Sequence, residues 1–297
     1  MQFFLEVLLG GLLSGIMYSM VALGFVLIYK ASGVFNFAQG AMVFFAALTA
    51  VGLHDLGLSL WIAVPLTMAI MIVLAIVIEK VVLRPLVNQA EITLFMVTIG
   101  LTFFIEGLAQ AIWGASVRKL ELGIDDIPLE YLLDTAGIAI SQFDLVAAGI
   151  AFVLVAGLAM FFSKTKVGRA LRAVADDHQA ALSIGIPLQQ IWVIVWGVAG
   201  FVALVAGLLW GARNGVQFAL TFVALKALPV LILGGFTSVP GAIVGGLIIG
   251  ASEKLAEVFL GPYVGGGIEG WFPYVLALLF LLVRPEGLFG EKIIRRI

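Results

Sequence analysis

The chain contains no cysteine, which excludes disulfides, thiolate metal sites and cysteine nucleophiles. It has only two histidines, His54 and His178, which lie far apart in the sequence, so we expect no metal site built from histidines. Charge is also scarce. Only 11% of the 297 residues are charged and the formal net charge is −2. The net charge says nothing about nucleic acid, but no basic patch suggests that the chain binds it.

The sequence also lacks the short motifs of common catalytic sites. It has no G-x-x-x-x-G-K-[ST] for nucleotide phosphates, no H-E-x-x-H and no G-x-S-x-G. No cluster of polar catalytic groups can be assembled from neighbouring apolar segments. These absences argue against an enzyme and favour transport, driven by a gradient or by a partner. Ionisable groups at mid-membrane, on which coupled carriers rely, are few, which favours a partner.

Apolar residues are abundant instead. They make up 63% of the chain and the mean hydropathy is +1.19, values that predict a polytopic, all-α membrane protein with one domain over residues 1–297. The predicted spans, eight or nine in number, are residues 7–29, 35–53, 58–79, 92–114, 143–162, 189–212, 219–234, 239–260 and 271–283. The first is expected to be retained rather than cleaved as a signal. The seventh and ninth are short enough to be re-entrant or half-length segments.

Basic residues orient these spans, because cytoplasmic loops are enriched in lysine and arginine. Eleven of the 16 basic residues fall on one predicted side, and they are Lys30, Lys80, Arg84, Lys164, Lys166, Arg169, Arg172, Arg284, Lys292, Arg295 and Arg296. Only three, Arg118, Lys119 and Arg213, fall on the other. The distribution predicts a cytoplasmic C-terminus. The loop of residues 115–142 is then external, and it is either a solvated loop or a platform for an external partner.

The segment 164–187 is the longest stretch in the middle of the chain that is both cationic and compatible with a helix. Basic residues come first, Asp176 and Asp177 follow, and Gly185 and Pro187 are helix-stop signals. Because it lies between two spans, we predict a cytoplasmic helical loop. Two interpretations remain open: a solvated amphipathic linker, or a helix that docks into a groove of a soluble partner.

Polar residues within the apolar segments are candidates for a solute pathway. Asn36 and Gln39 lie one turn apart at the start of the second span, where they either cap a tight helical hairpin or line the pathway. Glu106 and Lys226 lie inside spans, and they could form an ion pair across the bundle. Lys226 could also extend to the membrane surface or bind carbonyls of a broken helix.

Two further predictions concern glutamates and glycines in the C-terminal third of the chain. Glu253 and Glu257, four residues apart, are expected to face water or a vestibule. The pair Gly234-Gly235 precedes a turn and is interpreted as the end of a broken helix.

Several stretches carry a resemblance to a known family. They are SGIMYSMVALGFVLIYKASGVFNFAQGA (14–41), VVLRPL (81–86), TIGLTFFIEGLAQAIWG (98–114), TKVGRALRAVADDHQAALSIGI (165–186), ALKALPVLILGGFTSVPGAIVGGLIIGASE (224–253) and VRPEGLFG (283–290). Together they resemble the permease subunits of ABC importers of the branched-chain amino acid type, in particular the shorter of the two Liv-type permeases. Thr237 stands where that family commonly has glycine.

The resemblance implies a bacterial inner-membrane subunit that forms half of a translocation pathway. Its partners would be a second homologous permease, two cytoplasmic ATPases and a periplasmic solute-binding protein. ATP and magnesium would bind to the ATPases, so no cofactor is expected in this chain. A permease for urea or short amides, a stand-alone gradient-driven carrier or channel, and a purely structural scaffold remain alternatives.

The resemblance also assigns roles within residues 165–186, which it implies to be the segment that couples to the ATPases. Gly168 and Gly185 would bound its helix, and Arg169 and Arg172 would contact lipid or a partner. The part that would enter the partner's groove runs from Asp176 to Ser183 and includes Asp177, Ala180 and Ala181.

Overall fold

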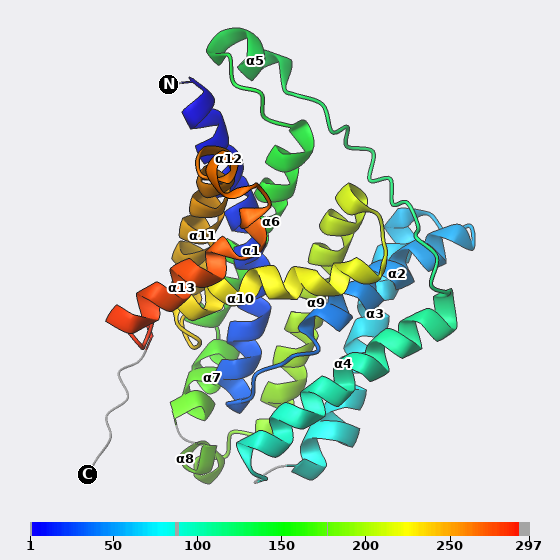
Figure 1. Cartoon of the computed structure of the whole chain (residues 1–297). Coiled ribbons are helices and arrows are strands. Elements are labelled where there is room, and N and C mark those ends of the chain that lie inside the picture. The colour runs from blue at the N-terminus through cyan, green and yellow to red at the C-terminus, as the bar shows by residue number, and fades with distance from the viewer. Residues whose placement is uncertain (1, 87–88, 177, 291–297) are drawn as a thin grey trace. The chain divides into compact units, whose positions relative to one another are not determined.

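The computed structural model describes residues 2–86, 89–176 and 178–290, and most of these are helical (Figure 1). The longer helices are α1 (Gln2–Ser32), α2 (Gln39–Asp55), α3 (Leu60–Val77), α4 (Glu91–Trp113), α6 (Gln142–Lys164), α7 (Lys166–Asp176), α9 (Leu188–Asn214), α10 (Val223–Gly234), α11 (Val239–Phe259) and α13 (Phe272–Val283). Short helical segments are η1 (Ile78–Leu83), η2 (Arg84–Leu86), α5 (Glu130–Ala136), α8 (His178–Ser183), η3 (Phe218–Phe222), α12 (Gly261–Val264) and η4 (Ile268–Gly270). No strand forms among the described residues, so the predicted all-α class is confirmed.

Each of the nine predicted apolar segments coincides with helix. Within the described residues, five stretches are long and apolar enough to cross a bilayer, namely α1, α3 with η1 and η2, α4, α6 and α9. The stretch 218–234 and α11 form a pair bent by 114°, which is a broken span or a re-entrant loop and raises the count to six. With 17 and 12 residues respectively, α2 and α13 fall short of that length. The predicted helix break at Gly234-Gly235 is therefore present.

The chain divides into two compact units. The central unit comprises Leu23–Glu121 and Gly157–Leu225, and the terminal unit comprises Met1–Ala22, Leu122–Ala156 and Lys226–Ile297. In the central unit, α2 packs against α3, α4, α9 and η3. Residues 39–53 of α2 are all buried, so this helix is the core of its unit.

Small residues allow the helices around α2 to approach closely. A side chain at Gly40 would meet the backbone carbonyl of Thr221, and one at Gly207 would lie 2.6 Å from the carbonyl of Val43. The ring of Trp113 packs where a side chain at Gly52 would project, and its Nε1 donates to Thr49 at 3.1 Å. Close helix packing through small residues is typical of membrane bundles, where lipid offers no hydrophobic gain from association.

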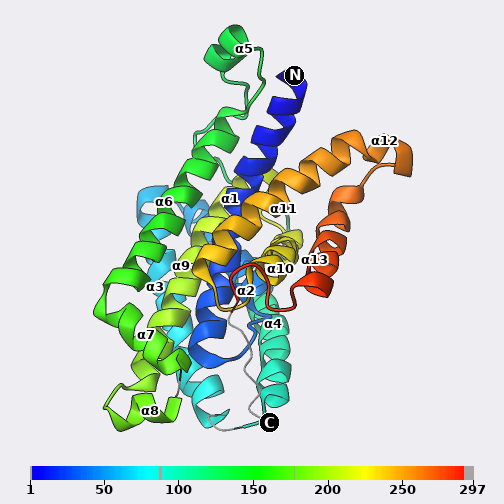
Figure 2. The ribbon, with the colours of Figure 1, turned by 90° about the vertical axis from the view of Figure 1, so that its left-hand side faces the viewer.

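In the terminal unit, the N-terminal part of α1 packs against α11 through Gly11 and Gly15. A Cβ atom at Gly11 would lie 2.7 Å from the carbonyl oxygen of Gly250, and one at Gly15 would collide with the carbonyl of Gly246. Figure 2 shows α11 running to the short α12, after which the chain turns back into α13.

The outer faces of α3, α4 and α6 expose large apolar side chains such as Trp61, Phe104 and Val153, as a bilayer requires.

Candidate functional site

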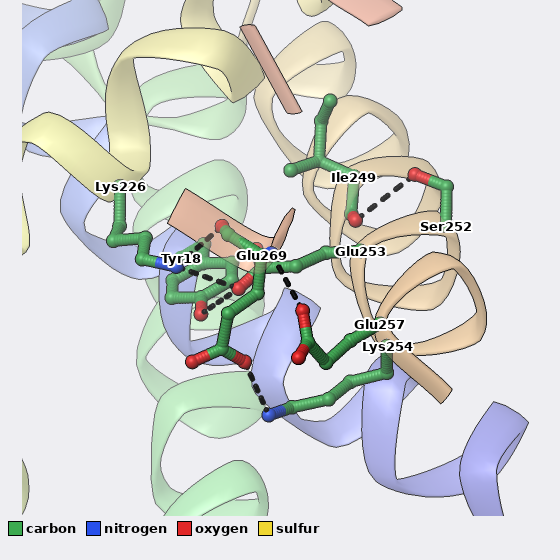
Figure 3. A network of polar contacts seen from close by, with 8 residues as sticks. All are labelled: Tyr18, Lys226, Ile249, Ser252, Glu253, Lys254, Glu257 and Glu269. Carbon is green, nitrogen blue, oxygen red and sulfur yellow. Dashed lines mark hydrogen bonds and ion pairs between the residues drawn. The ribbon is translucent and has the colours of Figure 1, made fainter. Parts of the chain in front are cut away.

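A polar network in the terminal unit connects α10, α11 and η4 (Figure 3). Lys226 Nζ donates to Glu253 Oε1 at 2.7 Å and to the backbone carbonyl of Glu269 at 2.8 Å. The Tyr18 hydroxyl, on α1, donates to the same Glu253 oxygen at 3.3 Å. A single lysine therefore holds both arms of the broken helix pair and the loop that follows them.

The burial of the two charges differs. The Glu253 side chain is 1% exposed, whereas that of Lys226 is 31% exposed. Glu253 Oε2 makes no hydrogen bond within the described part of the chain. An apolar interior tolerates such a carboxylate only when a cation stands beside it, so Lys226 stabilises the ionised form of Glu253.

One of the sequence expectations is wrong here, and one alternative that the sequence left open does not occur. Of the alternatives left open for Lys226, a bond to a backbone carbonyl is present, at Glu269, and the ion pair forms with Glu253 across the sharp bend between α10 and α11. The possible pair with Glu106 does not form among the described residues. Glu253 does not face water. Glu106 is itself 8% exposed, and the described residues offer it no ion pair or hydrogen bond.

The remaining charges fasten the loop after α12. Glu257 accepts hydrogen bonds from the backbone amides of Gly267 at 2.8 Å and Glu269 at 2.9 Å. Lys254 pairs with the Glu269 carboxylate at 3.0 Å, where both side chains are about two-fifths exposed. Gly267 has a φ of +68°, a left-handed conformation that glycine adopts without strain. The two glutamates, four residues apart, therefore have different partners: Glu253 pairs with Lys226, and Glu257 accepts hydrogen bonds from backbone amides.

The amides of Asn36 and Gln39 lie in the central unit and are completely buried. Asn36 Oδ1 accepts from the Ala38 amide at 3.1 Å, and its Nδ2 donates to Gln39 Oε1 at 3.4 Å. Gln39 Nε2 reaches the carbonyl of Ala199 on α9 at 3.4 Å. These bonds hold the turn before α2 together and tie it to α9, as hydrogen bonding in a tight hairpin would, but no side chain caps the first turn of α2. The place of the two amides on a solute pathway remains a prediction.

The segment 164–187 begins with a tight turn from α6 to α7. A side chain at Gly168 would collide with the backbone of Phe162, so only glycine fits. Arg172 Nη1 donates to the Phe162 carbonyl at 2.8 Å, and Thr165 Oγ1 accepts from the Gly168 amide at 3.2 Å. A cation on the last carbonyls of α6 is favourable for the helix dipole. Arg172 therefore secures the turn, while Arg169 is exposed.

The segment ends as its glycine predicts. Gly185 has a φ of +84°, its amide donates to Leu182 O at 3.0 Å, and the Ile186 amide donates to Ala181 O at 3.0 Å. This pair of bonds is a Schellman motif, which terminates α8. Both α7 and α8 pack against α9.

The faces of α7 and α8 divide into buried and exposed parts. Leu171, Val174 and Ala181 are at most 2% exposed, whereas Leu182 is 53% and Ile184 is 73% exposed. Ala181 is therefore not available to a partner in this structure. The side chains of Asp176 and Ala180, and all of Asp177, lie outside the described residues.

A metal centre finds no support in the described part of the chain, where no group of three histidine, aspartate or glutamate side chains could hold an ion. The fold and these sites define a polytopic helical membrane protein with a broken helix pair, an architecture that transporters use. The chain belongs to the family described as branched-chain amino acid transport system / permease component, whose model matches residues 7–284. The family is one of transport permeases rather than enzymes.

Curated relatives match over nearly the whole chain. The high-affinity branched-chain amino acid transport system permease protein BraD of Pseudomonas aeruginosa is 27% identical, over 99% of this chain and 98% of its own. LivH of Escherichia coli K12, which carries the same description, is 27% identical over the same shares. A probable branched-chain amino acid transport permease protein LivH of Methanocaldococcus jannaschii is 26% identical over 96% of this chain and 92% of its own.

Proposed function

We propose that this chain is the permease subunit of an ABC importer that carries branched-chain or related amino acids into the cell. Family membership over residues 7–284 and the descriptions of BraD and LivH support this function. In the proposal the chain forms half of the pathway and a second, homologous permease forms the other half. A periplasmic solute-binding protein delivers the solute. Two cytoplasmic ATPases bind ATP and magnesium, which this chain does not.

The observation that carries the proposal is the exposed apolar end of α8. Leu182 and Ile184 are both more than half exposed, and Gly185 stops the helix directly after them. A solvated linker gains nothing from exposing such side chains, whereas a groove on an ATPase would bury them. In this account Leu182 and Ile184 are the docking residues, while the buried Ala181 supports α8 from beneath.

The connections of this segment suit the transmission of force. Arg172 and the Gly168 turn tie the start of α7 to α6, and the residues Gly185 to Pro187 link α8 directly to α9. Displacement of α7 and α8 by closing ATPases therefore moves the ends of two long helices. Short, rigid links of this kind convert domain closure into tilting of spans.

The membrane orientation completes the proposal. The chain lies in the bacterial inner membrane, with α8 and the C-terminus in the cytoplasm. Arg84 and Arg284 lie on the same side. The excess of lysine and arginine on that side supports this orientation.

Cysteine cross-linking tests the proposal directly, because the chain has no native cysteine to confuse the result. In Ile184→Cys, we expect labelling by a membrane-impermeant maleimide only from the cytoplasmic side, and a cross-link to the ATPase in the complex. Tyr263→Cys, at a position that is 88% exposed between α11 and α13, is the matched control and should label only from outside without cross-linking. Labelling of Ile184→Cys from the periplasm contradicts the proposal.

A further inference from the structure

A pocket of about 390 Å³ lies in the central unit, where α3 ends and α9 begins. Its lining includes Glu79 and Lys80 from η1, Arg84 from η2, and Gln189, Val193 and Ile194 from α9. Arg84 Nη2 donates a hydrogen bond to Gln189 Oε1, which ties the two elements together beside the pocket. None of these residues belongs to the network around Lys226.

The carboxylate of Glu79 is the unusual feature of this pocket. Glu79 is 2% exposed, yet its Oε1 has no hydrogen-bond partner among the described residues. Leaving a buried carboxylate oxygen unpaired is costly, so buried polar atoms nearly always have a partner. Glu79 lines the pocket, so a donor bound there would satisfy this oxygen once the side chain turns toward it.

The backbone brings a cation to the same pocket as this acceptor. Residues 78–83 form a π-helical turn, and the Arg84 amide bonds to the carbonyl of Glu79, five residues back. In an α-helix, residues five apart point in different directions, whereas a π-turn brings them to the same side one above the other. Such turns are rare and are frequent at functional sites.

The pocket therefore presents both signs of charge. Glu79 supplies a buried acceptor, and Lys80 and Arg84 supply cations that are largely exposed. We propose that this pocket binds a zwitterion, whose primary ammonium donates to Glu79 and whose anionic group pairs with Arg84 and Lys80. One carboxylate is too few for a divalent cation, which takes several oxygen ligands.

Two sources offer this chemistry, a free amino acid and the headgroup of phosphatidylethanolamine. Both carry a primary ammonium and, a few bonds away, a carboxylate or a phosphate. The pocket lies at the end of the span Leu60–Leu86, which is the depth at which lipid headgroups and water meet a membrane protein. The proposed site does not depend on the transport function proposed above.

The test uses the full chain and compares a primary ammonium with its trimethylated analogue. The chain in detergent is equilibrated with equal amounts of phosphatidylethanolamine and phosphatidylcholine of the same acyl chains, and the retained lipids are counted by native mass spectrometry. In parallel, binding of radiolabelled L-leucine is measured by equilibrium dialysis against N,N,N-trimethyl-leucine as competitor. Since a trimethylammonium cannot donate an N–H, one of the primary ammonium probes should bind about tenfold more tightly than its analogue.

Variants separate the site from general lipid or leucine binding. Glu79→Gln should remove the preference for the primary ammonium, whereas Arg84→Gln should weaken the binding of both members of each probe pair, because they share the anionic group. Glu121→Gln, an exposed acid outside the pocket, should keep the preference. The arm that shows the preference identifies the source. The proposal is overturned if neither probe binds more tightly than its trimethylated analogue. It is equally overturned if Arg84→Gln, a change at an exposed position, binds both members of the pair as tightly as the wild type does.

Discussion

The ion pair of Lys226 and Glu253 yields the sharpest prediction for stability. Lys226→Met removes the charge that stands 2.7 Å from a carboxylate exposed by only 1%. Removing one partner of a buried pair costs about 3–5 kcal/mol, because the other charge is left uncompensated. Because Lys226 is 31% exposed, solvent partly screens its charge, and we expect a loss of stability at the lower end of this range, about 3 kcal/mol. That is roughly a hundredfold in the unfolding equilibrium constant.

The opposite change should cost less. In Glu253→Gln no charge remains buried, and Lys226 keeps its 2.8 Å bond to the Glu269 carbonyl and its route to water. We expect a loss of about 1 kcal/mol, the worth of an ordinary hydrogen bond. The double variant Lys226→Met/Glu253→Gln should recover most of the stability that Lys226→Met loses, since the orphaned charge is gone.

Unfolding of the purified chain in a denaturing detergent, followed by tryptophan fluorescence, measures these differences. Lys254→Met is the matched control, because its pair with Glu269 is 40% and 42% exposed, and exposed pairs contribute about 0–1 kcal/mol. Equal losses for Lys226→Met and Lys254→Met would refute the reasoning. So would a double variant no more stable than Lys226→Met.

Three further changes test other contacts. Gly15→Leu should destabilise the chain by several kcal/mol, because any side chain there meets the Gly246 carbonyl. Gly10→Leu, where the space is open, should be tolerated. Equal free energies of unfolding in detergent for the two variants would contradict the α1–α11 contact. Gly185→Ala should cost about 1 kcal/mol by thermal unfolding, since alanine is strained at a φ of +84°, and a stability equal to wild type would count against the Schellman stop. Ile184→Asp should leave stability unchanged but abolish solute-stimulated ATP hydrolysis in the complex, and retained stimulation would exclude docking at this residue.

Much of the fold follows from simple sequence features. A run of about 20 apolar residues can only be a membrane helix, so the positions of the spans are readable from hydropathy. Gly185 before Pro187 predicts the end of α8 because few other residues adopt a left-handed backbone. The break at Gly234-Gly235 is indicated for the same reason, although its angle of 114° depends on packing that the sequence does not state.

Pairings between distant polar residues were not predictable in the same way. From the sequence, Lys226 could pair with Glu106, extend to the membrane surface or bind carbonyls, and only the 114° bend between the two helices brings Glu253 beside it. The unpaired oxygen of Glu79 could not be predicted from the sequence, because an acidic residue at the end of an apolar span is ordinary. Only the structure shows its burial and the π-turn in which it lies. The spacing of small residues also does not tell which one is buried, which is why Ala181 had seemed available for docking.

The central claim is that this chain forms a pathway but has no power source of its own. The most direct measurement is uptake of radiolabelled leucine into proteoliposomes that contain the two permeases and the solute-binding protein, with and without the ATPases and ATP. The account predicts uptake only when the ATPases and hydrolysable ATP are both present. Leucine accumulation driven by an ion gradient, with the ATPases absent, would contradict it.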